Sequence, residues 1–413
     1  MKTSFIIRIL AISIQVLSMK YAKTIILAAA ILCVIAVAFF LQNGWDLQKT
    51  NISIPEITAN NTPKSWLMFR GTQNLQGWIP GSLPEALDYR WKFKTGGPII
   101  SSPVIHNGVV IVGSLDEFIY TIDLQSGKEI WKYHTEDSIE ATACVVRDKV
   151  FIGSADGFLY ALDFSTGKVT WKYKTEGKIL GSANWTFAPD GQSIWILVGS
   201  YDNKLHCVDS QSGKTVWTYE TGSYINGAPA ISEGKAVFGG CDAVIHVVST
   251  TDGKEVTRIE AEEYIAGSAA IFEQKIYVGN YAGTFICADI DLGEIIWKYE
   301  DSESPYYCSP AVSDEFVVVG SRDENVYCFG NSEGSVRWKF KTLGEIDSSP
   351  VICGDKVIIG SSDGRLYMID LSTGKKVWSY EIGESITSSA GIADGMVVIG
   401  CDDGYIYAFG VSK

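Results

Sequence analysis

A Gly-x-x-Asp element recurs through most of the chain at a nearly constant interval. It begins at seven glycines, and an eighth, Gly279, begins a variant with Ala282 in place of Asp. The seven are Gly113, Gly153, Gly199, Gly239, Gly320, Gly360 and Gly400. All intervals but one are 40 or 41 residues, and the exception is 46 residues. Eight such units indicate one repeat domain, because a set of stacked repeats counts as a single domain whatever its length.

Each unit contains short strand patterns separated by turns. In the second unit, apolar or alternating segments run over Val150–Gly153, Phe158–Asp163 and Val169–Lys174. A further apolar segment precedes the first glycine of a unit, as Ser102–Ile105 precedes Gly113. The turns are rich in Asp, Asn and Gly, which hydrogen-bond to their own backbone or accept positive φ. Four short strands in about 40 residues are typical of one blade of a β-propeller.

The two ends of the repeat region predict how the blades close into a ring. The last unit stops after its third strand, Tyr405–Phe409, with four residues left. The first tryptophan-bearing strand, Tyr89–Lys94, precedes the first complete unit and has no unit of its own. If this strand completes the last blade, no open edge remains. We therefore predict an all-β fold, an eight-bladed β-propeller with four antiparallel strands per blade and N-to-C closure in the last blade. An open solenoid, the alternative, needs capping units, and none is visible.

The outer strand of each blade but one carries a Trp two positions before another aromatic residue. The seven tryptophans are Trp91, Trp131, Trp171, Trp217, Trp297, Trp338 and Trp378. Residues two apart in a strand share a face, so we expect these rings to dock between neighbouring blades. A ligand platform is the alternative, but repetition around the whole ring favours structural docking. The fourth blade has Thr257 and Ile259 instead, so we expect a looser or differently packed joint there.

The segment Ala161-x-Asp163-x-x-Thr166-Gly167-Lys168-x-x-Trp171 resembles the tryptophan-docking repeat of proteins that bind pyrrolo-quinoline quinone (PQQ) and of their non-catalytic relatives. Partial copies run over 121–131, 207–217 and 368–378, and Trp66–Gly71 resembles the opening of many PQQ-like repeat proteins. The resemblance covers about residues 65–410. It implies indole rings docked between blades of a PQQ-like β-propeller.

The resemblance divides into an enzyme branch and a scaffold branch. Quinoprotein alcohol dehydrogenases of this kind carry PQQ, a calcium ion and a disulfide between adjacent cysteines, whereas no two cysteines are adjacent here. In its length and its lack of large insertions the chain is more similar to the BamB-type propeller, a lipid-anchored scaffold of outer-membrane assembly without enzymatic activity. We therefore expect a non-catalytic scaffold that binds proteins of the cell envelope and no cofactor. A PQQ-binding dehydrogenase or sensor with calcium, or a polysaccharide-binding module, is the alternative.

The N-terminal residues differ in composition from the repeats. Ile25–Leu41 is an unbroken apolar run preceded by Lys20 and Lys23. This pattern predicts that residues 1–41 form a signal peptide or a hydrophobic helix that anchors the chain in the membrane, with the rest outside the cytoplasm. Residues 42–64 are expected to be a linker and residues 65–413 the propeller. Met19 is an alternative start, and Cys33 lacks the small residue that a lipid-modified cysteine needs before it.

Four tyrosines near the starts of innermost strands form the candidate partner-binding rim of the ring. They are Tyr224, Tyr264, Tyr306 and Tyr307. Acidic residues stand near them in the sequence, namely Glu262, Glu263, Glu300, Asp301 and Glu303. An aromatic patch in an acidic rim is a reasonable face for a protein partner, although surface loops also tolerate tyrosine without any function. The net charge of −14 argues against a nucleic-acid partner.

The remaining candidates are weaker, and we expect neither catalytic residues nor a metal site. Glu140, Asn226 and Asp347 lie near innermost strands without a diagnostic spacing, and His206 and His246 share one position in adjacent units. Cysteines at another shared position are expected to be small buried residues. They are Cys207, Cys287 and Cys328. The stretches Gly330–Gly334 and Ser212–Thr215 imitate a hydrolase motif and a phosphate-binding loop, but both occupy repeat turns.

Overall fold

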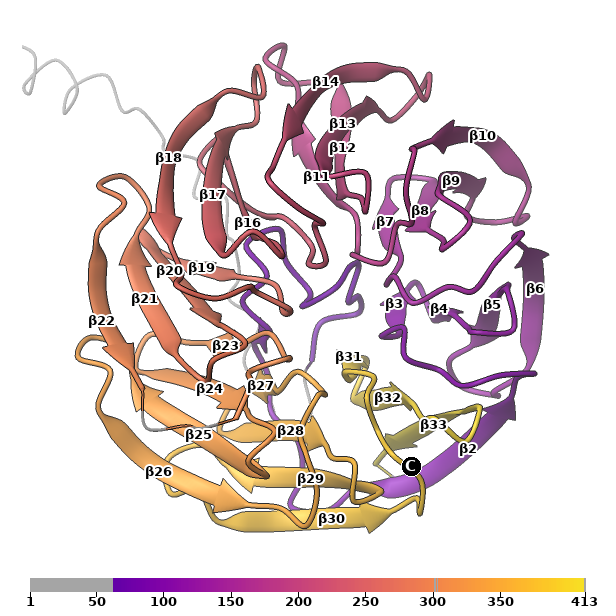
Figure 1. The fold of residues 1–413 in the computed structure, drawn as a ribbon. Helices are drawn as coiled ribbons and strands as arrows, with labels where there is room; N and C mark the ends of the chain where they lie inside the picture. Colours follow the sequence, from indigo (N-terminus) through magenta and orange to yellow (C-terminus); the bar gives the residue numbers. More distant parts are fainter. Residues whose placement is uncertain (1–61, 301, 303, 412–413) are drawn as a thin grey trace, which may run out of the picture. The chain divides into compact units, whose positions relative to one another are not determined.

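The computed structural model describes residues 62–300, 302 and 304–411, and they form eight antiparallel sheets of four strands in a ring, one of which is extended by a short fifth strand. Figure 1 shows the blades following one another in chain order around a central channel. The predicted all-β, eight-bladed propeller is therefore confirmed. The predicted N-terminal helix of residues 1–41 and most of the predicted linker lie outside the described residues. None of the described segments forms a helix long and apolar enough to cross a bilayer.

Each blade runs from an innermost strand at the channel to an outermost strand on the outside of the ring. Blades 1 to 4 are β3 (Val104–His106), β4 (Val109–Gly113), β5 (Phe118–Asp123), β6 (Glu129–His134); β7 (Cys144–Val146), β8 (Lys149–Gly153), β9 (Phe158–Asp163), β10 (Val169–Lys174); β11 (Asn184–Phe187), β12 (Ile194–Gly199), β13 (Lys204–Asp209), β14 (Thr215–Glu220); β15 (Ala230–Ser232), β16 (Lys235–Gly239), β17 (Val244–Ser249) and β18 (Glu255–Glu260). Blades 5 to 7 are β19 (Ala270–Phe272), β20 (Lys275–Gly279), β21 (Phe285–Asp289), β22 (Ile295–Tyr299); β23 (Ala311–Val312), β24 (Phe316–Gly320), β25 (Asn325–Gly330), β26 (Val336–Lys341); β27 (Val351–Cys353), β28 (Lys356–Gly360), β29 (Arg365–Asp370) and β30 (Lys376–Glu381). Blade 8 is β31 (Gly391–Ala393), β32 (Met396–Gly400), β33 (Tyr405–Gly410) and β2 (Asp88–Lys94).

Blade 8 joins the two ends of the repeat region. Strand β2 pairs antiparallel with β33, with Trp91 opposite Ala408. In Figure 1 the purple β2 lies along the outside of the yellow β33. The closure predicted from the unpaired first strand is confirmed, and it removes the sheet edge that an open array would expose.

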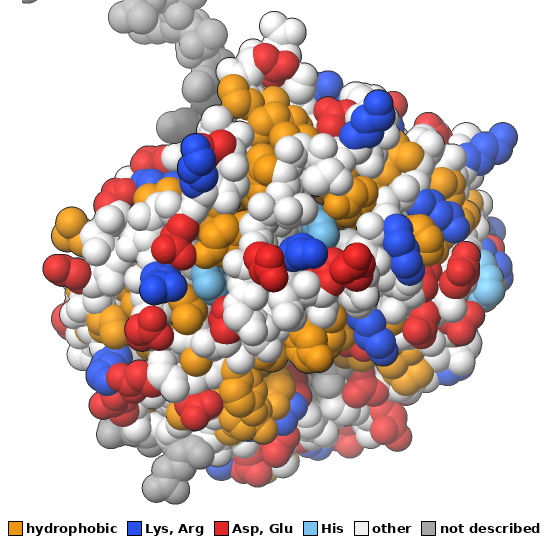
Figure 2. Space-filling view, turned by 45° about the horizontal axis from the view of Figure 1, so that its top comes forward, with side chains coloured by type: hydrophobic (Ala, Val, Ile, Leu, Met, Phe, Trp, Pro, Cys, Tyr) orange, Lys and Arg blue, Asp and Glu red, His pale blue; other side chains and the backbone are white. Residues whose placement is uncertain are grey.

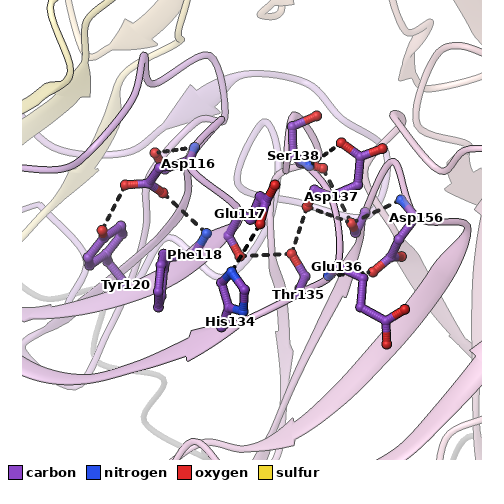
Figure 3. A network of polar contacts seen from close by, with 12 residues as sticks. Asp116, Glu117, Phe118, Tyr120, His134, Thr135, Glu136, Asp137, Ser138 and Asp156 are labelled. Atoms are coloured by element: carbon purple, nitrogen blue, oxygen red, sulfur yellow. Dashed lines mark hydrogen bonds and ion pairs between the residues drawn. The ribbon is translucent and has the colours of Figure 1, made fainter.

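The aspartate of the repeat ties each turn to the chain that enters the blade. In blade 1, Asp116 Oδ1 accepts the N–H of Phe118 at 3.2 Å, while its Oδ2 accepts the N–H of Gly96 at 2.5 Å and the hydroxyl of Tyr120 at 2.8 Å. Figure 3 shows Asp116 and also the equivalent aspartate of blade 2, Asp156, which accepts the N–H of Glu136. The carboxylate closes its own turn and holds the neighbouring connection, which accounts for the repeat.

The outer tryptophans dock onto the next blade. Trp131 Nε1 donates to the carbonyl of Phe164 at 3.0 Å, and its ring covers Gly167. That glycine has φ +68°, and a Cβ there would lie 2.5 Å from the ring. The same bond to a carbonyl in the following blade is made by Trp91, Trp171, Trp217, Trp297 and Trp338. Trp378 instead contacts Tyr380 and Phe409 through its ring.

The joint after blade 4 is packed in a different way, because its outer strand β18 lacks the aromatic pair. Thr257 faces Gly293 of the next blade, where the other joints place an indole. Ile259, in place of the second aromatic residue, is buried among the aliphatic side chains of blades 4 and 5. A smaller apolar contact therefore replaces the docked tryptophan.

A segment before the first blade, residues 62–79, crosses one end of the channel, and we name it the strap. Figure 1 shows its indigo trace inside the ring. It hydrogen-bonds to all eight blades. Its partners, from blade 1 to blade 8, are Ile105, Val145, Asn184, Ile231, Ile271, Val312, Ile352 and Asp394. Its last two residues form β1 (Trp78–Ile79), a short strand parallel to β27 of blade 7. The sequence did not predict this element.

The strap carries a buried arginine. Arg70 is 1% exposed, and its Nη2 donates to the carbonyl of Pro310 in blade 6 at 2.9 Å. Burial lowers the pKa of Arg70 to about 9, so the guanidinium stays charged at neutral pH. Gly77, with φ +63°, passes so close that a Cβ there would lie 1.8 Å from Nη2. The strap needs glycine at this position because the guanidinium takes up the space.

Candidate functional site

The central channel contains a cavity of about 170 Å³ to which every blade contributes. Phe69 of the strap also lines it. One residue from the entry of each blade surrounds the cavity, and we call this ring the mouth. Its members are Ile100, Glu140, Leu180, Asn226, Ala266, Tyr307, Asp347 and Thr387. Glu140, Asn226 and Asp347, which no spacing connected in the sequence, are brought together here because they occupy one equivalent position in different blades.

A second ring of residues, two positions further along the chain, also lines the cavity and carries hydroxyl groups. Each of these hydroxyls accepts a backbone N–H from the previous blade; for example, Thr142 Oγ1 accepts the N–H of Ser102 at 3.1 Å, and Ser182 Oγ the N–H of Thr142 at 2.9 Å. Ala228 interrupts the ring in blade 4 because it has no hydroxyl. The remaining hydroxyl-bearing residues of this second ring, which accept a backbone N–H in the same way, are Ser102, Ser268, Ser309, Ser349 and Ser389. These oxygens are already used to join blades, so they act in structure.

The mouth is acidic, and one of its carboxylates is neutralised by arginine. Arg322 holds Asp347 through two hydrogen bonds of 2.8 and 2.7 Å, and these bonds raise the pKa of the guanidinium. Burial raises the pKa of Glu140 and also that of Asp402, whose carboxylate accepts the hydroxyl of Thr387. A raised carboxyl pKa means that burial penalises the charged form. These groups would favour a cationic or hydrogen-bonding neighbour.

The tyrosines near the mouth contact one another through their rings. The rings of Tyr264 and Tyr281 are 4.2 Å apart at 29°, and Tyr281 meets Tyr307 edge-on at 5.6 Å. Arg322 lies 3.5 Å from the centre of the Tyr307 ring. We call Tyr264, Tyr281 and Tyr307 the tyrosine row. Beside it, Tyr224 stacks on Tyr201 with ring centres 4.8 Å apart and is 48% exposed.

Tyr306 corrects the sequence-based expectation for this rim. It is fully buried, and its ring lies against Gly279. In the other blades an isoleucine, such as Ile265 against Gly239, fills this position. The connection into blade 6 is one residue longer, which places Tyr306 at the isoleucine position and Tyr307 at the mouth. Counting from each repeat glycine could have revealed this register.

Tyr201 and Tyr281 were missed in the sequence, although each stands two residues after a repeat glycine. Of the acidic residues near the tyrosines, Glu262 and Glu300 both form ion pairs with Lys298, and Glu263 is exposed. Asp301 and Glu303 lie outside the described residues. Two of the three acids that the structure describes are therefore paired with Lys298.

The two histidines at equivalent positions form separate buried networks. His206 Nε2 lies 3.1 Å from Asp202, and its Nδ1 lies 2.9 Å from the hydroxyl of Tyr173. His246 makes the same contacts with Asp242 and Tyr219. In most blades a tyrosine fills this position and donates to the aspartate, as Tyr160 does to Asp156. Among the described residues, no cluster of His, Cys, Asp and Glu has the arrangement of a metal site.

His206 gives the fold a pH dependence. Burial lowers the pKa of His206. The unfolded chain therefore binds a proton at this histidine below about pH 6.5 more readily than the folded chain does. The free energy of unfolding therefore falls as the pH drops below about 6.5. The pKa of Asp202 is lowered, so the contribution of this carboxylate to stability is lost only below about pH 4. We expect His206→Tyr, which restores the common residue, to gain in melting temperature over the wild type as the pH falls from about 7.5 to 5.5.

Thermal melts across this pH range test the effect. His134→Tyr is the matched control, because His134 lies on the surface beside Glu117. A His206→Tyr variant that follows the wild-type profile at every pH would contradict the role assigned to burial.

The cysteines and the two imitated motifs are structural. Cys207, Cys287 and Cys328 are buried free thiols, and burial raises their pKa, to about 12 for the latter two. Gly330–Gly334 lies in the turn between β25 and β26, with Gly334 under the ring of Trp297. A nucleophile elbow needs a strand followed by a helix, so this turn has the wrong context. Ser212 also lies in a strand-to-strand turn, where its hydroxyl donates to Asp209.

The surface around the ring has mixed charge. In the view of Figure 2, acidic and basic side chains alternate over the face, and hydrophobic side chains form small patches between them. That face shows no broad basic area of the kind that binds phosphate backbones.

Comparison with known proteins supports this architecture. The chain matches BamB from Moraxella catarrhalis at 18% identity over 79% of this chain and 100% of that chain, with a TM-score of 0.66. It matches quinohemoprotein alcohol dehydrogenase from Comamonas testosteroni at 13% identity over 85% and 81% of the two chains, with a TM-score of 0.70. A europium-containing methanol dehydrogenase matches at 14% identity over 84% and 98%, with a TM-score of 0.67. At these identities the likeness concerns the fold alone.

Sequence comparison identifies the family. No curated protein matches the chain. Residues 106–354 match the family described as "Beta-alanine-activating enzyme, beta-propeller", and this match covers more than half of the chain. The chain therefore belongs to this β-propeller family, whose blades here are PQQ-type repeats.

Proposed function

We propose that this protein is a non-catalytic scaffold outside the cytoplasm that binds a protein of the cell envelope at the mouth of its channel. The observation that carries the proposal is the tyrosine row with Arg322 beside it. Tyrosine and arginine are enriched among the residues that dominate protein–protein binding energy. Because the rings pack against one another, little side-chain entropy remains to be lost on binding.

The location rests on the N-terminal sequence and on the BamB likeness. The apolar run Ile25–Leu41 after two lysines predicts export of the ring. A propeller of closely similar extent is the BamB of Moraxella catarrhalis. Both observations favour a scaffold of the envelope, with the membrane reached through the N-terminal segment.

A double variant, Tyr264→Ala with Tyr307→Ala, tests the proposal. We expect it to lose the partner, because it removes the two ends of the tyrosine row, while the free energy of unfolding falls by only about 1 kcal/mol for each lost aromatic contact. A photo-crosslinking residue placed at position 224 of the full chain reports the partner in cells. The adduct should disappear in the double variant and persist in Tyr89→Ala, a control in which an exposed stacked tyrosine is removed elsewhere. An unchanged adduct would contradict the proposal.

A quinoprotein dehydrogenase is the competing function, and the channel does not fit its cofactor. A cavity of about 170 Å³ is close to the size that holds one benzene molecule, whereas PQQ has three fused rings and three carboxyl groups. Among the mouth residues Glu140 and Asp347 are themselves acidic, and the nearby Arg322 is already paired with Asp347. Calcium takes 6–8 oxygen ligands, and among the side chains of the mouth only Glu140 and Asn226 offer a carboxylate or amide oxygen that is not paired with arginine.

Adding PQQ and Ca²⁺ to the purified protein distinguishes the two functions. On the scaffold proposal, neither the absorbance of PQQ nor the melting temperature changes, and no dye is reduced with simple alcohols or sugars. Dye reduction that Glu140→Gln abolishes would establish the enzyme instead.

A further inference from the structure

A groove runs over the strap side of the ring, across blades 5, 6 and 7. It consists of two adjoining cavities of about 380 and 480 Å³ that share Asp314, Glu315 and Phe316. Trp78 of the strap and Phe272 of blade 5 line the first cavity, and Arg337 lines the second. Both cavities exceed the channel cavity and fall in the range of about 300–1,000 Å³ that ligand pockets occupy. We call this feature the strap-side groove.

Blade 6 departs from the most common residue of the repeat at this groove. Phe316 begins strand β24, and the equivalent residue is a lysine in blades 2, 4, 5 and 7, a valine in blade 1, a tryptophan in blade 3 and a methionine in blade 8. The four lysines are Lys149, Lys235, Lys275 and Lys356. Compared with the blades that have lysine, blade 6 has an aromatic ring in place of a cation, so the turn residues Asp314 and Glu315 have no lysine next to them in the chain. One end of the groove is therefore apolar, with acids at its border.

Trp78 differs from the docking tryptophans. It is 37% exposed, and its indole N–H has no partner among the described residues, whereas six docked indoles each donate to a backbone carbonyl. Its backbone is held in β1, where it pairs with Ile352 of β27. An exposed indole with a free donor on a fixed backbone has the properties of an interface anchor.

The charge of the groove selects its occupant. Asp314 and Glu315 make no ion pair with any residue that the structure describes, while Glu333 is paired with Arg337. The chain as a whole carries a net charge of −14, so a basic partner is attracted at long range as well. We infer that the strap-side groove binds an extended segment of a partner protein in which a large apolar side chain is flanked by lysine or arginine. The apolar side chain enters beside Trp78 and Phe272, and the cations meet Asp314 and Glu315.

This inference is independent of the proposed function. The groove involves the strap and the turns at the far ends of the innermost strands, and it shares no residue with the tyrosine row. A scaffold that uses both the tyrosine row and the strap-side groove would hold two partners at once, one on each side of the ring.

A phage-displayed library of random nine-residue peptides, selected on the immobilised full chain, tests the groove. We expect enriched peptides with an aromatic or large aliphatic residue between basic residues. Trp78→Ala and the charge-reversed pair Asp314→Lys with Glu315→Lys should each weaken the binding of these peptides about tenfold or more. Fluorescence anisotropy with a synthetic copy of an enriched peptide measures the affinity.

Matched controls are available in the same chain. Phe187→Ala removes another exposed aromatic ring, and Glu220→Lys with Glu260→Lys reverses two exposed charges that form no ion pair among the described residues. These variants, and the Tyr264/Tyr307 double variant, should bind the peptides as the wild type does. A selection without basic and apolar peptides, or peptides that bind the groove variants with unchanged affinity, would overturn the inference.

Discussion

Replacing Trp338 by alanine should lower the free energy of unfolding by about 3–5 kcal/mol. Trp338 is 9% exposed, its Nε1 donates to the carbonyl of Leu371 at 2.8 Å, and its ring covers Gly374 of the next blade. The change removes a large buried ring and leaves a carbonyl without its donor. The gap lies between two blades whose backbones are held by neighbouring joints, so it cannot collapse fully, and the cost stays near the upper end for core substitutions.

Two further variants separate the causes of this loss. Trp338→Phe keeps much of the apolar contact and should cost about 1–3 kcal/mol, the penalty of one unsatisfied buried polar group. Trp78→Ala, which removes a partly exposed indole with no hydrogen-bond partner, should cost less than about 1 kcal/mol. Urea denaturation followed by circular dichroism measures all three. Equal losses for Trp338→Ala and Trp78→Ala would show that the docked tryptophans do not hold the blades together.

Leu75→Ala should cost about 2–5 kcal/mol, although Leu75 belongs to no blade. It lies in the strap, is 1% exposed and packs with aliphatic side chains of blades 4 and 5, including Ile271. The strap hydrogen-bonds to every blade, so loosening it weakens one end of the whole ring. Leu343→Ala is the matched control, because Leu343 is 75% exposed and its loss should change stability by no more than about 0.5 kcal/mol.

The same urea denaturation distinguishes these two leucines. If Leu75→Ala and Leu343→Ala lose equal stability, the strap is an accessory to a ring that is complete without it. If Leu75→Ala alone is destabilised, the ring includes the strap as a structural member.

Much of the ring could be read from local patterns. The Gly-x-x-Asp spacing places a turn and the side chain that closes it within one short segment, as Asp116 closes its turn onto Phe118. The docking of Trp131 on Gly167 likewise involves neighbouring units with the same residues. Interactions that repeat with the period of the chain leave a visible periodicity, so the blade number and the closure by β2 were predictable.

The candidate site was less predictable, because it forms where equivalent positions of different blades meet. Glu140 and Asp347 are far apart in the chain and lie in one cavity only after the ring closes. The burial of Tyr306 depends on one additional residue in the connection into blade 6, which shifts the register of the whole loop. No single segment shows this effect, and a unit-by-unit comparison is needed to find it.

The sequence alone determined the repeat, the eight blades, the closing strand and the tryptophans that dock between blades, because each depends on contacts within a unit or between adjacent units. The path of the strap, the convergence of the mouth residues and the groove beside Trp78 are visible only in the folded molecule. The strap has no periodicity of its own, and its hydrogen bonds reach as far as Asp394 at the other end of the chain. Such contacts follow from the geometry of a closed ring, in which residues distant in sequence face a common axis.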